Sequence, residues 1–285
     1  TGPGGTGVST AAIALAQALA DDVRHAGLVL LADLRLHAEQ AMLHDARDVV
    51  PGVQELVEAH RAGEPSADAV RALSFAVAER GYRLLLGLRQ ARHWSAIRPR
   101  AFEAAFASLQ RAYRVIVADT DPDLEGEDSG GSVDVEERHA MARTVARRAD
   151  VVFAVGLPSM KGMHALVRVV AELIGFGLVP ERIVPVVNRA PRAPRVRAGM
   201  AAALAELTAP VLPSPVAGLP SPIFLPERKV DEALVDGTRL PPALGAPLAG
   251  AFGAVLERAP ATGASDSPTP VRPGTLGRWA SWETA

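Results

Sequence analysis

The chain has 285 residues, which is enough for one large α/β domain or two small ones. Hydrophobic residues make up 48% of it, and the formal net charge of −2 gives no general attraction to nucleic acid or to an anionic membrane. There is no cysteine, which excludes disulfides and cysteine metal sites, and no uncharged apolar run reaches about 18 residues. No secretory leader pattern opens the sequence. These features favour a soluble, cytoplasmic protein.

Short apolar runs alternate with longer helical patterns along the chain. After an opening loop and an alanine-rich helix, strands are predicted at 28–33, 82–88, 113–121, 151–156 and 182–189. Helices are predicted between them at 51–63, 99–113, 135–149 and 163–177, with a last packing helix at 241–259. The strand segments are continuous apolar runs, which are typical of a parallel sheet covered on both faces. The sequence therefore predicts a doubly wound, mostly parallel α/β domain with its ligand at the carboxyl ends of the strands.

The two ends of the chain have a different character from the middle. We expect the domain to span residues 1–260 and a disordered tail, rich in Pro, Ser and Thr, to span 261–285. Trp279 and Trp282 in this tail are either a docking motif or mere tail composition, and we favour composition. A phosphate-binding loop normally follows a strand, and no apolar run precedes Thr1. The first strand, which belongs in the middle of the sheet, is therefore expected to be missing from this chain.

The opening stretch TGPGGTGVST has the spacing of a phosphate-binding loop, G-x-x-x-x-G-K-S/T. Gly2, Gly7 and Ser9 occupy three of its places, and Val8 stands where the lysine is expected. Glycines allow successive N–H groups to converge on an anion, and the helix that follows adds its partial positive charge. The Ser9 hydroxyl is a candidate ligand for Mg²⁺. The alternative is a glycine-rich turn that binds nothing.

The missing lysine has an energetic consequence. A charge-assisted hydrogen bond is worth about 1.5–3 kcal/mol, and such a charge matters more where negative charge develops in a transition state. Diphosphate binding can therefore survive weakly, whereas hydrolysis is expected to suffer far more.

The order of motifs resembles one family. GPGGTGVST with its alanine-rich helix, then LLADL, VIVADTD and VVNR, resembles the MinD/ParA family of P-loop ATPases over residues 1–256. Within it, the bacterial CpaE/TadZ pilus-positioning proteins and the actinobacterial MinD-like proteins are the most similar branch. The family's loop reads KGGxGKT, so Pro3 and Val8 stand at its two lysines. The resemblance implies nucleotide contacts at Gly2, Gly4, Gly5, Thr6, Gly7, Val8, Ser9 and Thr10.

The resemblance also implies a Mg²⁺ site and a hydrolytic acid. It assigns the metal to Ser9, Asp33 and Asp119, of which Asp119 corresponds to the Walker B aspartate. The alternative for Asp119 is a cap on the turn after its strand. Arg35 stands at the aspartate that positions the attacking water in relatives, and an arginine cannot accept a hydrogen bond from that water. Arg35 either reaches phosphate in place of the missing lysine or is solvent-exposed at a strand end, and we favour exposure.

Two further positions match the family's base-side contacts. Asn188 corresponds to the residue that reads the adenine edge, and Pro226 lies in the segment beside the base, followed by Val230 and Ala233. An Asn side chain offers the donor and the acceptor that a base edge needs. The alternative for Asn188 is a simple turn residue after a strand.

The remaining charged residues give weaker signals. The acidic run 119–137 is expected to be a solvated loop, with binding of a basic partner as an alternative. Arg143, Arg147 and Arg148 form a helical cluster that we expect to be a solvated face, and Lys161 is expected at the surface. The histidines lack metal-ligand spacing, no G-x-S-x-G elbow appears, and direct reading of nucleic acid is unsupported.

The sequence thus predicts a degenerate MinD/ParA-like protein that binds ATP or ADP with Mg²⁺ weakly or not at all, with little or no hydrolysis. By resemblance, it would position or scaffold a cell-pole, septum, secretion or pilus machine through protein partners. It is a possible homodimer, with only indirect membrane contact. The alternatives are an active ATP-dependent dimerising switch and an interaction module that binds no nucleotide.

Overall fold

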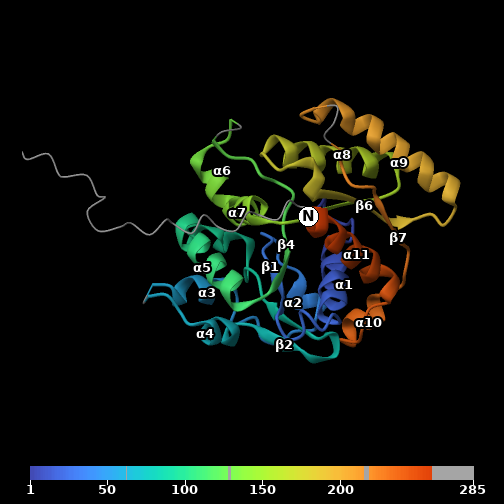
Figure 1. Ribbon diagram of the computed structural model, residues 1–285. Coiled ribbons are helices and arrows are strands. Elements are labelled where there is room, and N and C mark those ends of the chain that lie inside the picture. The colour runs from blue at the N-terminus through green and yellow to red at the C-terminus, as the bar shows by residue number, and fades with distance from the viewer. Residues whose placement is uncertain (62, 128–129, 215–217, 259–285) are drawn as a thin grey trace, which may run out of the picture.

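The computed structural model describes residues 1–61, 63–127, 130–214 and 218–258. Its strands form two sheets (Figure 1). They are β1 (Val29–Asp33), β2 (Phe75–Val77), β3 (Tyr82–Leu85), β4 (Val115–Asp119), β5 (Val152–Gly156), β6 (Ile183–Ala190) and β7 (Ile223–Pro226). The sheet orders are β2–β3–β1–β4 and β5–β6–β7, and all neighbours run parallel except β2, which is antiparallel to β3. This confirms the predicted mostly parallel α/β fold. The expected tail lies outside the described residues.

The helices connect and cover these strands. They are α1 (Val8–Ala20), α2 (Gln40–Leu43), α3 (Val53–Ala59), α4 (Ala67–Ala72), α5 (Pro99–Ala112), α6 (Val133–Arg138), α7 (Ala140–Arg148), α8 (Met160–Gly175), α9 (Pro194–Thr208), α10 (Asp231–Val235) and α11 (Pro242–Arg258). Short 3₁₀ turns lie at Ala78–Arg80, Ala91–Ala96, Pro180–Arg182 and Ala209–Val211. The helix predicted at 135–149 is instead two helices that meet at His139. In the described chain, no helix has the length and apolarity needed to cross a bilayer.

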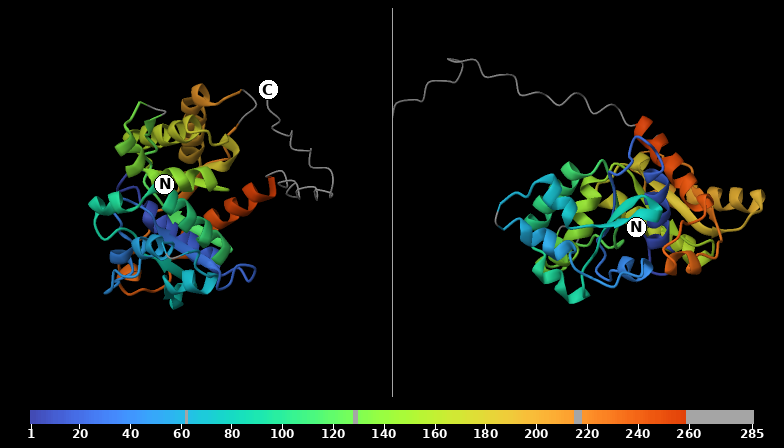
Figure 2. Two further views of the ribbon diagram at one scale, coloured as in Figure 1. Left: turned by 90° about the vertical axis from the view of Figure 1, so that its left-hand side faces the viewer. Right: turned by 90° about the horizontal axis from the view of Figure 1, so that it is seen from below.

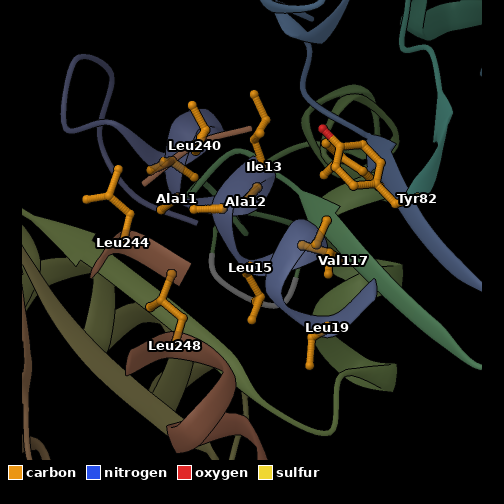
Figure 3. Close-up of a cluster of buried hydrophobic side chains, with 14 of the residues drawn as sticks. Ala11, Ala12, Ile13, Leu15, Leu19, Tyr82, Val117, Leu240, Leu244 and Leu248 are labelled. Carbon is orange, nitrogen blue, oxygen red and sulfur yellow. The ribbon is translucent and has the colours of Figure 1, made fainter. Parts of the chain in front are cut away.

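Alternate strand residues face opposite helical layers, as expected for a sheet buried on both faces. In β1, Val29 and Leu31 point into a cluster that spans both sheets and includes α1, α10 and α11 (Figure 3). Leu30 and Ala32 point into a second cluster with α3 and α5. A third cluster packs α8 and α9 against β5 and β6. Figures 1 and 2 show α1 and α11 side by side and α8 and α9 over the smaller sheet.

Helix α11 is the predicted last packing helix, and it lies directly against α1. A Cβ on Gly245 would come within 2.3 Å of the Ala14 carbonyl oxygen, so this close approach requires glycine. Just before α11, the buried Gln17 side chain donates to the Leu240 oxygen at 3.0 Å and accepts from the Leu240 nitrogen at 2.8 Å. Because α1 contacts β1 and β4 while α11 contacts β7, the α1–α11 pair joins the two sheets.

The two sheets are separated by a slot. In the described residues, β4 and β5 are each the last strand of their sheet. Thr1 pairs with β5, because its nitrogen donates to the Phe153 oxygen and its oxygen accepts from the Val155 nitrogen, both at 2.9 Å. A cavity of about 290 Å³ lies beside it, lined mainly by apolar residues of α1, β4, β5 and α11.

An added strand should fill this slot. Fusing five alternating Val and Ile residues ahead of Thr1 would continue the pairing of Thr1 with β5, place a strand beside β4, and bury apolar side chains. We expect the melting temperature to rise, by about 2–4 °C for each kcal/mol gained. Thermal unfolding followed by circular dichroism measures the change. A control extension of Gly and Ser with the same length should leave the melting temperature unchanged. An equal rise with both extensions would contradict the prediction that an apolar strand fills the slot.

Candidate functional site

The opening loop has the backbone shape of an anion-binding turn. Gly5 and Gly7 have φ values of 77° and 84°, which favour glycine. The Thr6 nitrogen and hydroxyl both bond the Pro3 oxygen, at 3.4 and 2.6 Å, and close the turn. Gly7 is the N-cap residue that precedes α1, and no side chain caps this end of the helix. Backbone N–H groups at the start of α1 are therefore available to an anion.

The side chain at the lysine position points into the core. Val8 is only 5% exposed and belongs to the apolar cluster beneath α1. A Cβ on Gly2 would meet Val8 Cγ2 at 3.0 Å and the Val155 oxygen at 2.3 Å, so Val8 packs under the loop where the loop approaches β5. Ser9 is buried as well. Since residues 1–10 contain no Lys or Arg, the loop offers an anion backbone dipoles without a side-chain cation.

Two buried carboxylates lie side by side at the carboxyl ends of the central strands. Asp33 of β1 is in register with Asp119 of β4, and neither is exposed. Gln40, the first residue of α2, binds both of them. Its nitrogen donates to Asp33 Oδ2 and its Nε2 to Asp119 Oδ2, each at 2.8 Å, while Nε2 also lies 3.3 Å from the Ser9 oxygen. Gln40 therefore links both predicted metal carboxylates to the helix of the loop.

Arg35 completes this carboxylate cluster, so the favoured prediction that it is solvent-exposed was wrong. Its side chain is 12% exposed, with Nη1 lying 3.5 Å from Asp119 Oδ1 and Nη2 lying 3.2 Å from Asp121 Oδ1. Asp121 also accepts from the Leu36 nitrogen at 2.6 Å. The reason is topological: parallel pairing brings the segments after β1 and β4 to the same edge, and the buried carboxylates attract the guanidinium.

The pKa of Asp33 is raised from 3.8 to about 7. The largest cause is burial, which disfavours the charged carboxylate, and the second is the neighbouring Asp119. Hydrogen bonds from the Gln40 and Arg35 nitrogens oppose this rise. Asp33 therefore carries a proton over part of the neutral pH range in the folded protein.

The predicted base-side residues lie next to the loop. Asn188 Nδ2 donates to the Thr6 oxygen at 2.8 Å, and Asn188 Oδ1 accepts from the Arg189 nitrogen at 2.9 Å. Pro226, at the end of β7, pairs with Ala190 of β6. The structure thus brings Asn188 to the loop and Pro226 to the same end of the sheet. Both ends of the Asn188 amide already have protein partners, and its role toward adenine stays a prediction.

A cleft of about 1070 Å³ opens beyond these residues. Its charged lining is of mixed sign and comprises Arg189, Arg192, Glu227, Arg228, Lys229 and Asp231. Arg189, which lines this cleft, directly follows Asn188, the residue that bonds the opening loop. Its volume is sufficient for a nucleoside-sized ligand.

The start of the acidic run is a loop in which Asp123, Glu125 and Glu127 are exposed, as expected, while Leu124 and Gly126 pack against Arg143. Arg143 is buried, donates to the Leu124 oxygen, and lies over the Phe176 ring at 4.9 Å. A Cβ on Gly126 would lie 2.4 Å from Arg143 Nη1. The prediction of a solvated Arg143 was therefore wrong, whereas Arg147, Arg148 and Lys161 are exposed as expected. Within the described ranges, no group of three or more His, Asp or Glu side chains could hold a metal.

Sequence reasoning missed two members of the carboxylate cluster. Asp121 lies in VADTD, and the acidic residue two places after Asp119 was a usable signal. Gln40 gave no comparable signal, because its role depends on how the chain after β1 turns back to begin α2.

Replacing Asp33 should change the pH dependence of stability. With its folded pKa above its unfolded value, Asp33 stabilises the folded protein at low pH, and this contribution is lost as the pH rises through about 7. The parent's free energy of unfolding should therefore fall through this residue as the pH rises from about 3.8 to about 7, by an amount on the order of a few kcal/mol, and the melting temperature should fall with it. Asp33→Asn should flatten the fall, because Asn stays neutral. If the melting temperatures of the parent and of Asp33→Asn changed in parallel with pH, the pKa of Asp33 would not be raised in the folded protein.

No family model and no curated protein matches the chain. Among solved structures, the ParA family ATPase from Chlorobium tepidum aligns with a TM-score of 0.63 at 16% identity, covering 89% of this chain and 95% of that one. The MinD protein of the MinC:MinD complex from Aquifex aeolicus gives 0.61 at 18%, covering 91% and 95%.

A third solved structure carries a nucleotide. The septum site-determining protein MinD from Pyrococcus horikoshii, complexed with Mg-ADP, aligns with a TM-score of 0.56 at 20% identity and covers 90% of this chain and 92% of that one. These likenesses agree with the order of motifs along the chain. The protein therefore has the fold of the MinD/ParA P-loop ATPases.

Proposed function

We propose that this protein is a degenerate MinD/ParA-like nucleotide binder, which holds ADP or ATP weakly and hydrolyses ATP slowly or not at all. One observation carries the proposal: the phosphate-binding loop keeps its shape, while Arg35 and Gln40 occupy the carboxylates that would serve hydrolysis. The site is therefore built to retain a ligand and poorly equipped to turn it over.

Nucleotide binding is supported by the geometry of the loop and its surroundings. The left-handed Gly5 and Gly7, together with the uncapped start of α1, give a backbone cradle for phosphate oxygens. The cleft beyond Asn188 has room for a nucleoside. The MinD structure from Pyrococcus horikoshii, which has the same fold, contains Mg-ADP.

Loss of hydrolysis is supported by the chemistry of the side chains. Val8 offers no charge to the β- and γ-phosphates, where charge stabilisation in the transition state matters most. Arg35 has no lone pair with which to orient or deprotonate water. Asp119, the other carboxylate at this edge, is held by Gln40 and faces Arg35.

The cellular role follows from resemblance. The related MinD from Aquifex aeolicus is found in complex with MinC. By analogy, the protein acts through protein partners, in the cytoplasm and with indirect membrane contact, to position or scaffold a cell-pole, septum, secretion or pilus machine. A role like that of the CpaE/TadZ proteins and a homodimeric form are parts of this proposal.

Restoring the lysine should strengthen binding. Val8→Lys adds one charge-assisted contact, which is worth about 1.5–3 kcal/mol or roughly a ten- to hundredfold lower Kd for ADP. Calorimetry with ADP and ATP measures the change. Val8→Met is the matched control for side-chain bulk in the core, and it should bind no tighter than the parent.

The other outcomes would replace the proposal. If the parent shows no heat and no melting-temperature shift at millimolar nucleotide, while Val8→Lys binds, the pocket is vestigial and the protein is an interaction module. If the parent hydrolyses ATP above background and Asp119→Ala abolishes the turnover, it is an active ATPase switch. Equal affinity of Val8→Lys and Val8→Met would show that a lysine at position 8 makes no phosphate contact and would contradict this prediction.

A further inference from the structure

We propose that Arg35 takes the place of the divalent cation, so that the protein binds no Mg²⁺ at Asp33 and Asp119 and holds its nucleotide without metal. The second half of this statement rests on the proposed nucleotide binding, and the first half does not. The fold is one in which Mg-ADP is found in a related structure. The arrangement of side chains in this chain differs from what such an ion needs.

Three of the four carboxylate oxygens of Asp33 and Asp119 accept hydrogen bonds, and the fourth, Asp119 Oδ1, lies against Arg35. Asp33 Oδ2 and Asp119 Oδ2 both accept from Gln40 at 2.8 Å. Two oxygens of this cluster, Asp119 Oδ1 and Gln40 Oε1, have no hydrogen-bond partner among the described residues. These are therefore the oxygens that a cation would use. Asp119 Oδ1 faces the Arg35 guanidinium at 3.5 Å. A Mg²⁺ ion there would lie next to a fixed positive charge.

The geometry of Mg²⁺ makes this conflict costly. The ion requires octahedral coordination at about 2.0–2.1 Å and retains several of its waters. A hydrated ion at Asp119 Oδ1 would have to displace the guanidinium, which also pairs with Asp121 at 3.2 Å and is largely shielded from solvent. Displacement would leave Asp121 without this partner in a partly buried place. The resident guanidinium is thus the more stable counter-ion.

Arg35 can also face a phosphate. A guanidinium has five N–H donors in a planar fork and binds phosphate well. Two carboxylate contacts leave donors for oxygens of a ligand on the loop. Such a contact supplies one positive charge where Mg²⁺ supplies two, which is consistent with holding a diphosphate without driving its hydrolysis.

Metal binding alone tests the first half without nucleotide. Titration of Mn²⁺, followed by the loss of its free electron paramagnetic resonance signal, should show no binding to the parent at this site up to millimolar metal. Arg35→Ala should gain a Mn²⁺ site, at least about tenfold tighter than any site in the parent, and Asp119→Asn added to it should remove the gain. Arg35→Lys, which keeps the charge, should resemble the parent.

The matched control is Arg24→Ala. Arg24 pairs with Asp22 on the surface, with its side chain 74% exposed, so its removal frees a carboxylate far from the loop. It should gain no Mn²⁺ site. Circular dichroism establishes that each variant is folded. Mn²⁺ binding to the parent that Asp119→Asn abolishes would overturn the proposal, as would a folded Arg35→Ala that gains no site.

Nucleotide binding tests the second half. The Kd of the parent for ADP should be the same within about twofold in MgCl₂ and in EDTA, whereas Arg35→Ala should bind ADP more tightly with Mg²⁺ than without it. A parent whose affinity falls by about tenfold or more in EDTA refutes metal-free binding and leaves the proposed nucleotide binding intact. A parent that binds ADP in neither buffer refutes nucleotide binding and metal-free binding together, and the Mn²⁺ titration still decides whether Arg35 excludes the metal.

Discussion

The parallel pairing of β1 with β4 is the constraint on which the site depends. It places Asp33 directly opposite Asp119 in a part of the core without solvent contact. Two buried carboxylates repel each other and lose their hydration, so they require donors from the protein. Gln40 and Arg35 supply these donors, and in doing so they fix the path of the chain between β1 and α2.

The same edge of the sheet determines how the loop is held. The loop approaches β5 so closely that Gly2 has no room for a side chain, and Asn188 of β6 donates to its Thr6 oxygen. Gln40 reaches the Ser9 oxygen from the other side. Asn188 and Gln40 thus support the loop through hydrogen bonds to backbone oxygens, which need no particular side chain at position 8. This explains how an anion-binding turn persists without a lysine.

Much of the fold was predictable from the sequence because buried parallel strands read as continuous apolar runs. β1, β3, β4 and β5 lie within predicted segments, and β6 extends one residue beyond its segment. β2 and β7 were missed because each is short and has no long apolar run. The long helix α9 was also missed, since its alanine-rich sequence is mostly exposed and has no strong apolar stripe. Among the site residues, the loop glycines and both aspartates were found from motifs. The burial of Arg35 and the part played by Gln40 arise from tertiary packing between segments far apart in sequence.

The α1–α11 contact has a consequence for how the chain is made. Ribosomes deliver the N-terminal segment first, and domains generally fold as units during synthesis. Here the first helix buries its apolar face against the last one, and Gln17 finds its partners at Leu240, 223 positions later. Until residues 242–258 emerge, α1 lacks the surface that covers it, and contacts of such long range form slowly. After α1 has been synthesised, the nascent protein therefore holds a helix whose apolar face is not fully covered until residues 242–258 have emerged.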